Sequence, residues 1–577
     1  MTAKKYAENK RKLLSNETFL SPVKTIGSVP INVSLVFPNT YNMGMSNLGF
    51  HSIYYQINSR DDALCHRAFL STSNNVSTNN INTLEADKPI SEYDIVGFSV
   101  SFELDYINII KILESAHISA FSQNRNRPLV MAGGPAVTFN PEPLAPFIDF
   151  FVIGEGEEVI HEIIDQYNKV QNKDKLDILQ ALSQIKGVYV PAFYKIAYDK
   201  KGKVTDVKHE STGNSTISKR WVRDLNKYNT ETVILTPYTE FKDMFLMEIS
   251  RGCGRNCRFC MAGYCYRVPR YRSLDMVLER AQFGSKYKDK IGLVGAAVSD
   301  YPYIDELAEK LMQNNIKFSV SSLRADTLRE PLMSGLAFSG HKTLTIAPEA
   351  GSEKLRKVIN KGITDKHVIN SVKLARKFGI NNVKLYYIIG LPEETEDDLK
   401  EMVEFLTFLR GYMKNLGNKT GTMTISVNPF IPKPFTPFQW LGMEPIKLLN
   451  DKINFLQNRL RPIGIKVIFE SPRLSEIQSA LARGDRQTGL LLYDIYKKGV
   501  TTSAYKKSEI EGKSISYYAH RQFDLEDILP WSHIDIGLKK EYFISEYNLA
   551  LQGKSTARCT DEKCRVCKIC QNKENEV

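Results

Sequence analysis

Two series of short apolar runs, separated by gaps of helix length, constrain the fold of this chain most. The first series comprises INVSLVF (31–37), YDIVGFSVS (93–101), PLVMAGG (128–134) and FFVIG (150–154). The second comprises FLMEIS, IGLVGAAV, KFSVSS, TLTIA, NNVKLYYIIG, TMTISVNPF and IKVIFE. Strands that alternate with helices form parallel sheets. The pattern therefore predicts an α/β protein with two parallel-sheet units.

The spacing of these runs predicts the domain boundaries. A basic lead (1–25) precedes an open α/β domain over residues 26–195. Residues 196–242 are rich in Lys, Asp, Gly, Ser and Thr, which suits a linker or an edge hairpin. The second series leaves room for one helix in each gap, as a β/α barrel or part-barrel over 243–470 requires. Residues 471–577 are predicted to be helical with a cysteine-rich tail.

Composition limits the functional classes. Apolar residues make up 42% and charged residues 25%, which excludes a disordered or low-complexity chain. No run approaches the roughly 20 apolar residues of a membrane span, and the start lacks the apolar run of a secretory signal. We therefore expect a soluble, cytoplasmic protein without a membrane partner. A net charge of +12 makes an acidic partner such as RNA plausible.

Three cysteines directly after the first strand of the second series point to inorganic chemistry. Cys253, Cys257 and Cys260 have the spacing C-x3-C-x2-C within a segment interrupted by Gly252 and Gly254. Glycine disfavours a helix and permits the tight turns of a loop around a cluster. Three thiolates suit an iron-sulfur cube, of which one iron stays open. Four nearby arginines would offset the cluster's negative charge: Arg251, Arg255, Arg258 and Arg267.

This segment resembles the marker of radical S-adenosylmethionine (SAM) enzymes. The resemblance implies a partial (β/α)6 barrel and a [4Fe-4S] cluster whose open iron binds SAM. It further implies that one electron, from a flavodoxin- or ferredoxin-type donor, cleaves SAM to a 5′-deoxyadenosyl radical. By resemblance, the candidate SAM-contacting residues are Phe259, Gly295, Glu349, Gly351, Ser352, Ile388 and Gly390. Two departures are Gly295-Ala296-Ala297 where the family often has Gly-Gly-Glu, and Tyr386 where a Gly is usual; Ser299 and Asp300 are weak substitutes, and Arg356 is a further candidate.

The amino-terminal domain resembles the flavodoxin-like cobalamin-binding domains that are fused to radical enzymes. Asn39, Tyr41 and Gly44 fall on that family's Asp, His and Gly positions, so the axial imidazole is absent, and His51 is expected to be an ordinary helix residue. Small residues at the carboxyl ends of the strands would form the ligand crevice: Ser99, Ser101, Gly133, Gly134, Gly154 and Gly156. The resemblance implies cobalamin held without a protein imidazole; the alternative is a domain that keeps the fold without the cofactor.

The tail packs Cys559, Cys564, Cys567 and Cys570 into twelve residues. A zinc ribbon separates its cysteine pairs more widely, so the run favours an auxiliary iron-sulfur cluster, with zinc or a redox-active tail as alternatives. Cys65 and Cys265 are expected to be packed core residues.

Three functional hypotheses follow. The first is cobalamin-dependent methyl transfer from SAM to an unactivated carbon. The second is a methylthiotransferase-like or sulfur-inserting reaction on RNA or protein, suggested by the proline-rich NPFIPKPFTPFQW segment and the tail cysteines. The third is a binding or maturation factor for RNA or a ribosomal component, in which the +12 charge supplies phosphate affinity.

Overall fold

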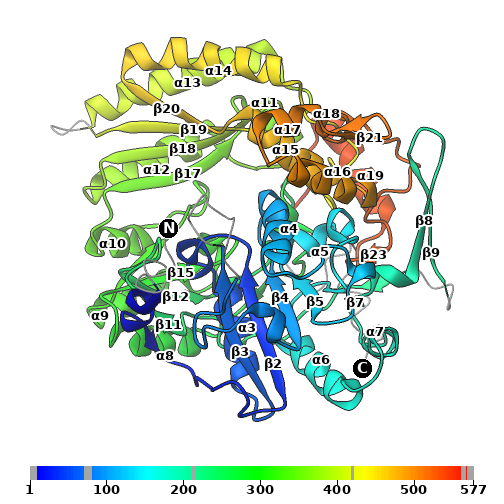
Figure 1. The fold of residues 1–577 in the computed structure, drawn as a ribbon. Coiled ribbons are helices and arrows are strands. Elements are labelled where there is room, and N and C mark those ends of the chain that lie inside the picture. Colours follow the sequence, from blue (N-terminus) through cyan, green and yellow to red (C-terminus); the bar gives the residue numbers. More distant parts are fainter. Residues whose placement is uncertain (1–9, 71–80, 211–215, 417–420, 560–566, 568–577) are drawn as a thin grey trace.

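A six-stranded sheet organises the amino-terminal part of the chain (Figure 1). The computed structural model describes residues 10–70, 81–210, 216–416, 421–559 and 567. The sheet order is β3-β2-β4-β5-β6-β7, and all neighbours are parallel except the antiparallel β7. The strands are β2 (Ile31–Phe37), β3 (Ala63–Phe69), β4 (Ile95–Ser99), β5 (Leu129–Gly133), β6 (Phe150–Val152) and β7 (Val188–Tyr189). In chain order, the five parallel strands follow the flavodoxin-like sequence 2-1-3-4-5, which confirms the predicted fold class.

Strand β3 is the one parallel strand of this sheet that the sequence pattern did not indicate; the short antiparallel β7 was not indicated either. Strand β3 contains His66 and Arg67, which break an apolar run, yet both side chains are buried. Arg67 is neutralised there by ion pairs of 2.7 Å to Glu17 and 2.6 Å to Glu85. A buried charge is stable only when it is paired in this way, and neither partner belongs to the strand, so local sequence could not reveal it.

Helices cover both faces of this sheet. They are α3 (Leu48–Asn58), α4 (Tyr106–Ser115), α5 (Pro135–Phe139), α6 (Gly156–Val170) and α7 (Lys175–Leu182). Helix α4 was predicted from the spacing of Tyr106, Ile109 and Leu113, and all three are fully buried. The segment after the sheet forms an antiparallel hairpin of β8 (Tyr194–Tyr198) and β9 (Val204–His209), as one of the two predictions for it had suggested.

The second series of strands forms a part-barrel of two parallel sheets. The first has the order β12-β15-β16 and the second β17-β18-β19-β20, and an isolated parallel bridge joins Leu323 to Ile346 between them. The strands are β12 (Met244–Glu248), β15 (Lys290–Val294), β16 (Lys317–Val320), β17 (Thr343–Glu349), β18 (Asn382–Ile389), β19 (Met423–Pro429) and β20 (Ile465–Phe469). The predicted six-stranded barrel thus gains a seventh strand, β20, from IKVIFE.

Helices fill the gaps between the barrel strands: α8 (Leu274–Ser285), α9 (Ile304–Gln313), α10 (Glu330–Phe338), α11 (Glu353–Val358), α12 (Asp365–Lys377), α13 (Glu396–Asn415) and α14 (Ile446–Leu460). The predicted N-cap of α12 is present, since the Thr364 side chain accepts a hydrogen bond from the His367 backbone. No helix within the described ranges is long and apolar enough to cross a membrane.

The carboxyl-terminal helices return to the amino-terminal domain. They are α15 (Pro472–Arg483), α16 (Arg486–Lys497), α17 (Thr502–Lys507), α18 (Ile515–His520) and α19 (Lys540–Leu551). In Figure 1, α15 and α16 lie beside α4, and one hydrophobic core includes Ile109 of α4, Leu481 of α15 and Leu492 of α16. The amino-terminal domain and these carboxyl-terminal helices are therefore packed as one body beside the barrel.

Candidate active site

The three clustered cysteines lie in a loop that is closed at its neck. After β12 the chain forms β13 (Ser250–Arg251), which pairs antiparallel with β14 (Arg270–Tyr271) and brings the two ends of the loop together. Gly252 has φ +83°, and a Cβ atom there would meet the Tyr266 carbonyl oxygen at 2.1 Å. Only glycine fits this position, because a side chain would be strained and would clash.

The structure brings Cys253, Cys257 and Cys260 together. Cys257 is buried, and the other two are partly buried. Burial, and then the negative charge of the neighbouring Cys257 thiolate, raise the pKa of Cys253 to about 11 and that of Cys260 to about 12. In the described ranges, no three His, Cys, Asp or Glu side chains converge closely enough to hold a single metal ion. A cube does not need such a convergence, since each thiolate binds a different iron.

Two buried cations that the sequence analysis missed face this group. Arg324 and Lys361 both interact with the Cys257 sulfur, and Lys361 also interacts with Cys260. Lys361 is held by Glu349 at 3.0 Å, and Arg324 by Asp326 at 3.0 Å. In the chain, Arg324 lies about 70 residues and Lys361 about 100 residues beyond the cysteines. No local motif could therefore show them.

The predicted arginines have mixed roles. Arg255 interacts with Cys253 and pairs with Asp300 and Asp326. Arg258 is fully buried, pairs with Glu546 and donates to backbone carbonyls, so it is a structural anchor. Arg251 pairs with three carboxylates, those of Glu155, Glu157 and Glu248.

A pocket of about 360 Å³ lies inside the barrel and holds three of the candidate SAM residues: Phe259, Glu349 and Ile388. Tyr386, Asn428 and Lys433 line it as well. The remaining candidates are engaged elsewhere. Ser352 caps α11 and donates to Asp398, while a Cβ on Gly351 would meet the Asp398 carbonyl oxygen at 2.4 Å.

Gly390 donates its N–H to Glu394 at a turn with φ +76°. The proposed substitutes for the absent Gly-Gly-Glu also have partners: Ser299 accepts from the Arg324 backbone, and Asp300 pairs with Arg255. Arg356 pairs with Asp365 and donates to the Ala350 carbonyl. These residues shape the barrel without facing the pocket.

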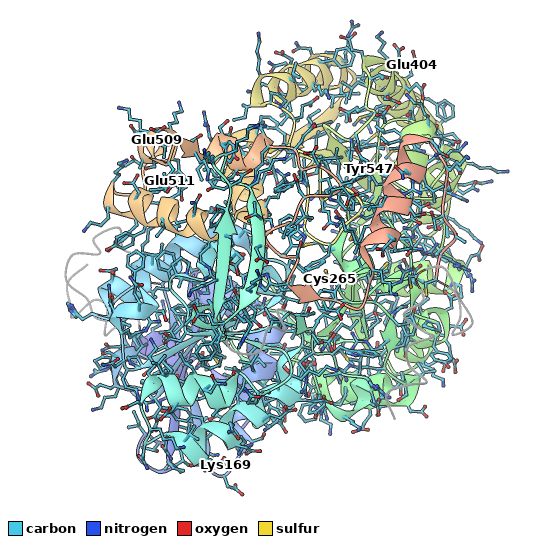
Figure 2. All side chains as sticks on the ribbon, turned by 90° about the vertical axis from the view of Figure 1, so that its right-hand side faces the viewer. Lys169, Cys265, Glu404, Glu509, Glu511 and Tyr547 are labelled. Atoms are coloured by element: carbon cyan, nitrogen blue, oxygen red, sulfur yellow. The ribbon has the colours of Figure 1, made fainter. Side chains whose placement is uncertain are left out.

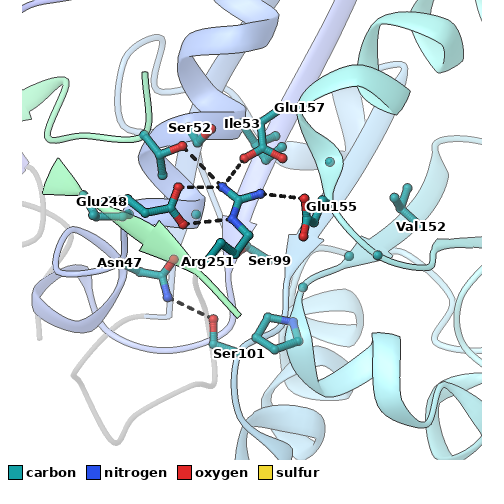
Figure 3. Close-up of a pocket in the computed structure, with 18 of the residues that line it drawn as sticks. Asn47, Ser52, Ile53, Ser99, Ser101, Val152, Glu155, Glu157, Glu248 and Arg251 are labelled. Atoms are coloured by element: carbon teal, nitrogen blue, oxygen red, sulfur yellow. Dashed lines mark hydrogen bonds and ion pairs between the residues drawn. The ribbon is translucent and has the colours of Figure 1, made fainter. Parts of the chain in front are cut away.

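A larger pocket of about 470 Å³ lies between the carboxyl edge of the amino-terminal sheet and the start of the barrel (Figure 3). Six predicted crevice residues line it: Ser99, Ser101, Gly133, Gly134, Gly154 and Gly156. The barrel contributes Ser250, Arg251 and Gly252, together with Gly295 and Ala296, so Gly295 faces this pocket and not the smaller one. The cluster loop therefore forms part of its wall.

The pocket continues inward between the sheet and helices α3 and α6. Leu35, Gly97 and Met131 stand side by side on β2, β4 and β5. The Ser52 hydroxyl lines the cavity and is buried without a hydrogen-bond partner in the described part of the chain. An orphaned hydroxyl in a largely apolar cavity is the kind of group that a ligand satisfies.

Arg251 is the charged centre of this pocket (Figure 3). Its guanidinium lies 3.0 Å from Glu155, 2.6 Å from Glu157 and 2.9 Å from Glu248. Arg270 also pairs with Glu155, at 2.6 Å. The sequence did not indicate that Glu155 and Glu157 lie at a pocket, because their segment EGEEV is typical of the start of a helix.

Three predicted cofactor residues lie outside the pocket. Asn39 donates to Asp105, and the Tyr41 hydroxyl donates to Glu17. A Cβ on Gly44 would meet the Phe69 ring at 2.5 Å. The helix that follows supplies Asn47 and Ser52 in their place. His51 contacts the Met45 carbonyl and accepts from the Val233 backbone, so it is the ordinary helix residue that was expected.

Family models match both parts of the chain. The model of the Radical SAM superfamily matches residues 247–406, which include the cysteine loop. The model described as Radical SAM proteins, N-terminal, matches residues 49–191. This chain belongs to the radical SAM superfamily. The predicted resemblance is therefore confirmed, and the protein is an enzyme of that class.

Several relatives are similar to this chain over part or most of its length. An uncharacterized protein of Methanocaldococcus jannaschii is 33% identical over 84% of this chain and 96% of its own length. An uncharacterized methyltransferase of Pyrococcus horikoshii is 25% identical over 54% of this chain and 63% of its own length. The tRNA-2-methylthio-N(6)-dimethylallyladenosine synthase of Pelagibacter ubique is 27% identical over 31% of this chain and 44% of its own length.

Solved radical SAM enzymes show weaker likeness. The methyltransferase TsrM from Kitasatospora setae, with cobalamin and a [4Fe-4S] cluster bound, has a TM-score of 0.46 at 13% identity over 71% of this chain and 77% of its own. The enzyme OxsB, with aqua-cobalamin and SAM bound, has a TM-score of 0.45 at 16% identity over 95% of this chain and 81% of its own.

The residues present fit the radical SAM cluster. The donor set is three thiols on one loop, and the buried Arg324 and Lys361 supply the positive charge that an anionic cluster needs. Of the four cysteines of the predicted tail site, Cys559 and Cys567 are described, whereas Cys564 and Cys570 lie outside the described residues. Cys65 and Cys265 are buried in the cores, as expected.

Proposed function

We propose that this radical SAM enzyme transfers a methyl group from SAM to an unactivated carbon, with cobalamin bound in the pocket between the two domains. One observation carries the proposal. The carboxyl edge of a flavodoxin-like sheet and the neck of the cysteine loop line the same cavity. A carrier held there would lie next to the barrel in which SAM is cleaved.

The pocket has the surface that a corrin requires. Gly133, Gly134 and Gly154 expose backbone where a broad ring could lie flat, and Leu35, Gly97 and Met131 form an apolar recess. None of the described residues that line it is a histidine, so cobalamin would bind without a protein imidazole. The Ser52 hydroxyl would find its missing partner in a polar group of the cofactor.

The cluster and SAM together would supply a 5′-deoxyadenosyl radical, and cobalamin would supply a methyl carrier. Cys253, Cys257 and Cys260 would hold the cluster, while Lys361 and Arg324 would offset its charge. Phe259, Glu349 and Ile388 would contact SAM inside the barrel. The ion pairs of Arg251 would keep the pocket wall in place.

Lys433 links the barrel to the amino-terminal domain. Its ammonium pairs with Glu103, which follows β4, and Glu103 also accepts from Gln478 of α15. Lys433 belongs to the proline-rich segment after β19, and Phe430 and Ile431 of that segment also line the smaller pocket. A substrate would enter between this segment and the cluster loop.

The test uses anaerobic protein reconstituted with iron, sulfide and hydroxocobalamin. We expect corrin absorbance that survives gel filtration and, with SAM and a one-electron donor, 5′-deoxyadenosine. Cobalamin-dependent S-adenosylhomocysteine would report methyl transfer. A protein that cleaves SAM but retains no corrin would overturn the cobalamin part of the proposal.

Gly133→Leu gives this test a structural readout. A Cβ at Gly133 would meet only the Val152 Cβ, at 3.7 Å, so the larger side chain can be accommodated by the fold and projects into the pocket. We expect corrin retention to fall by about tenfold or more, because a leucine occupies the floor of the site, while the iron content stays unchanged. Gly411→Ala, at a position with nothing within 4 Å, is the control.

Sulfur insertion is the second candidate, favoured by the matches to methylthiotransferases. Those matches cover 38 to 44% of the relatives' own lengths. In this case sulfide, and not cobalamin, would be required for turnover. An RNA or ribosomal partner would show instead as salt-sensitive RNA binding without SAM cleavage.

A further inference from the structure

The segment that precedes the tail cysteines is bound to the cysteine loop. The backbone N–H of Cys559 donates to the Gly254 carbonyl at 2.7 Å, and Asn256 donates to the Ala557 carbonyl at 2.8 Å. Asn360 links the two from the side, donating to the carbonyls of both Asn256 and Thr556. We refer to residues 554–559 as the C-terminal strap.

Arg258 anchors the strap from below. It is fully buried and donates to the Lys554 carbonyl and the Thr556 hydroxyl, while it pairs with Glu546 at 3.1 Å. Figure 2 shows α19, labelled at Tyr547, above the loop labelled at Cys265, and the rings of Tyr264 and Phe543 lie 5.8 Å apart. The strap therefore has a fixed position relative to the first cluster site.

The close approach leaves no room between loop and strap. A Cβ added to Gly254 would lie 2.9 Å from the Cys559 carbonyl oxygen and 3.4 Å from the Cys559 Cβ. Cys253, the first cysteine of the loop, directly precedes Gly254. The Tyr271 hydroxyl interacts electrostatically with both Cys253 and Cys559, so both sulfurs lie in its neighbourhood.

Arg267 identifies what belongs beside Cys559. This side chain is 3% exposed, and its hydrogen bonds go only to neutral groups, the Tyr542 hydroxyl and the Asn256 amide oxygen. Its Nε is buried without an acceptor, and no carboxylate pairs with it in the described ranges. Its charge instead faces Cys567 and Cys559. A buried cation needs an anion nearby, and here the available anions are thiolates.

We propose that Cys559 and Cys567 are ligands of a second iron-sulfur cluster, held by the strap against the loop of the first and neutralised by Arg267. Cys567 is 8% exposed, in the same core as Tyr264 and Phe543. The presence of the second cluster does not depend on the proposed function, but its role in electron transfer to the first cluster does. A ferredoxin- or flavodoxin-type donor would give one electron to the second cluster, which would pass that electron to the first, leaving the donor oxidised by one electron.

The presence of the cluster is tested by metal analysis of the full chain. Cys253→Ala/Cys257→Ala/Cys260→Ala should keep about half of the wild-type iron and acid-labile sulfide. Adding Cys559→Ser/Cys567→Ser should remove the rest. A triple variant that contains no iron, or that contains zinc in place of iron, would overturn the proposal. Adding Cys567→Ser alone to the triple variant repeats this test while Cys559, the strap cysteine, stays unchanged. This variant should also lose the remaining iron.

Proximity and role have separate readouts. Fully reduced wild-type protein should show electron paramagnetic resonance signals broadened by spin coupling, which either single-cluster variant loses. Cys559→Ser/Cys567→Ser should form 5′-deoxyadenosine with dithionite but at least about tenfold more slowly with a flavodoxin-type donor. If the Cys559→Ser/Cys567→Ser variant forms the product at equal rates with both reductants, the relay is overturned. If wild-type protein forms no product with either reductant, the proposed function is rejected instead.

Discussion

Arg251 of the barrel pairs with Glu157 of the amino-terminal domain, and the two charged groups lie 2.6 Å apart. Arg251 ends β13 at the neck of the cysteine loop, while Glu157 lies in the first turn of α6. Both side chains are largely buried, and both line the larger pocket. The pair therefore couples the position of the cluster loop to the wall of the proposed cobalamin site.

Glu155 should make this junction sensitive to acid. Burial opposes its ionisation, but hydrogen bonds from Arg270 and the charges of Arg251 and Arg270 outweigh burial and lower its pKa from 4.5 to about 2. Because the folded pKa is the lower one, the stabilisation is complete above pH 4.5 and is lost as the pH falls toward 2. Glu155→Gln should lower the free energy of unfolding at pH 7 by roughly 3 kcal/mol.

Urea unfolding at a series of pH values measures this effect. The variant should show a shallower loss of stability below pH 4.5 than the wild type. Asp397→Asn, in an exposed pair with Lys400, is the control and should change neither quantity. An unchanged acid slope in Glu155→Gln would contradict the prediction.

Cys257→Ala should abolish 5′-deoxyadenosine formation, because the cluster would lose one of its three protein ligands. Cys265→Ala is the matched control. It lies in the same loop, and burial raises its thiol pKa to about 12, as suits a packed side chain. Liquid chromatography of the nucleoside product distinguishes the two. Retained turnover in Cys257→Ala would reject the radical mechanism.

Lys361→Met should make the first cluster harder to reduce. Removing a buried positive charge beside Cys257 and Cys260 favours the oxidised state, which carries less negative charge. We expect a more negative reduction potential and SAM cleavage slower by about tenfold, the equivalent of 1.4 kcal/mol. Lys354→Met, on an exposed side chain, should leave the potential unchanged. Redox titration followed by spectroscopy tests both.

Arg258→Ala should loosen the C-terminal strap. It leaves Glu546 buried without its cation, so we expect a loss of about 3 to 5 kcal/mol in the free energy of unfolding. Arg329→Ala, at a highly exposed arginine, should change it by less than about 0.5 kcal/mol. Equal stability of the two variants would show that the strap is not anchored in this way.

The sequence predicted those features that local patterns encode. The apolar runs located every barrel strand and four of the parallel strands of the first sheet, and the C-x3-C-x2-C spacing located the cluster loop. Features that depend on distant partners were missed. Strand β3 was missed because Arg67 interrupts its apolar run. The partners that neutralise Arg67, Glu17 and Glu85, lie outside the strand. Lys361 comes to the cysteines only through the packing of the barrel.

Motif position was a weaker guide than strand geometry. Asn39, Tyr41 and Gly44 align with a cofactor motif, yet they contact other parts of the protein. In contrast, the small residues at the strand ends all reach the pocket, because the carboxyl edge of a parallel sheet is one continuous surface. Ser352 shows a further ambiguity, since one hydroxyl pattern serves either a ligand or a helix cap.

The anchoring of Arg258 makes the packing of the cysteine loop depend on helix α19 and the C-terminal strap. Its partners Glu546, Lys554 and Thr556 are translated almost 300 residues after it. Without these partners, the buried guanidinium would keep the carbonyls of Lys357 and Val358 but would lose its counter-ion. The cysteine loop can therefore reach its final packing only when residues 546–556 are in place.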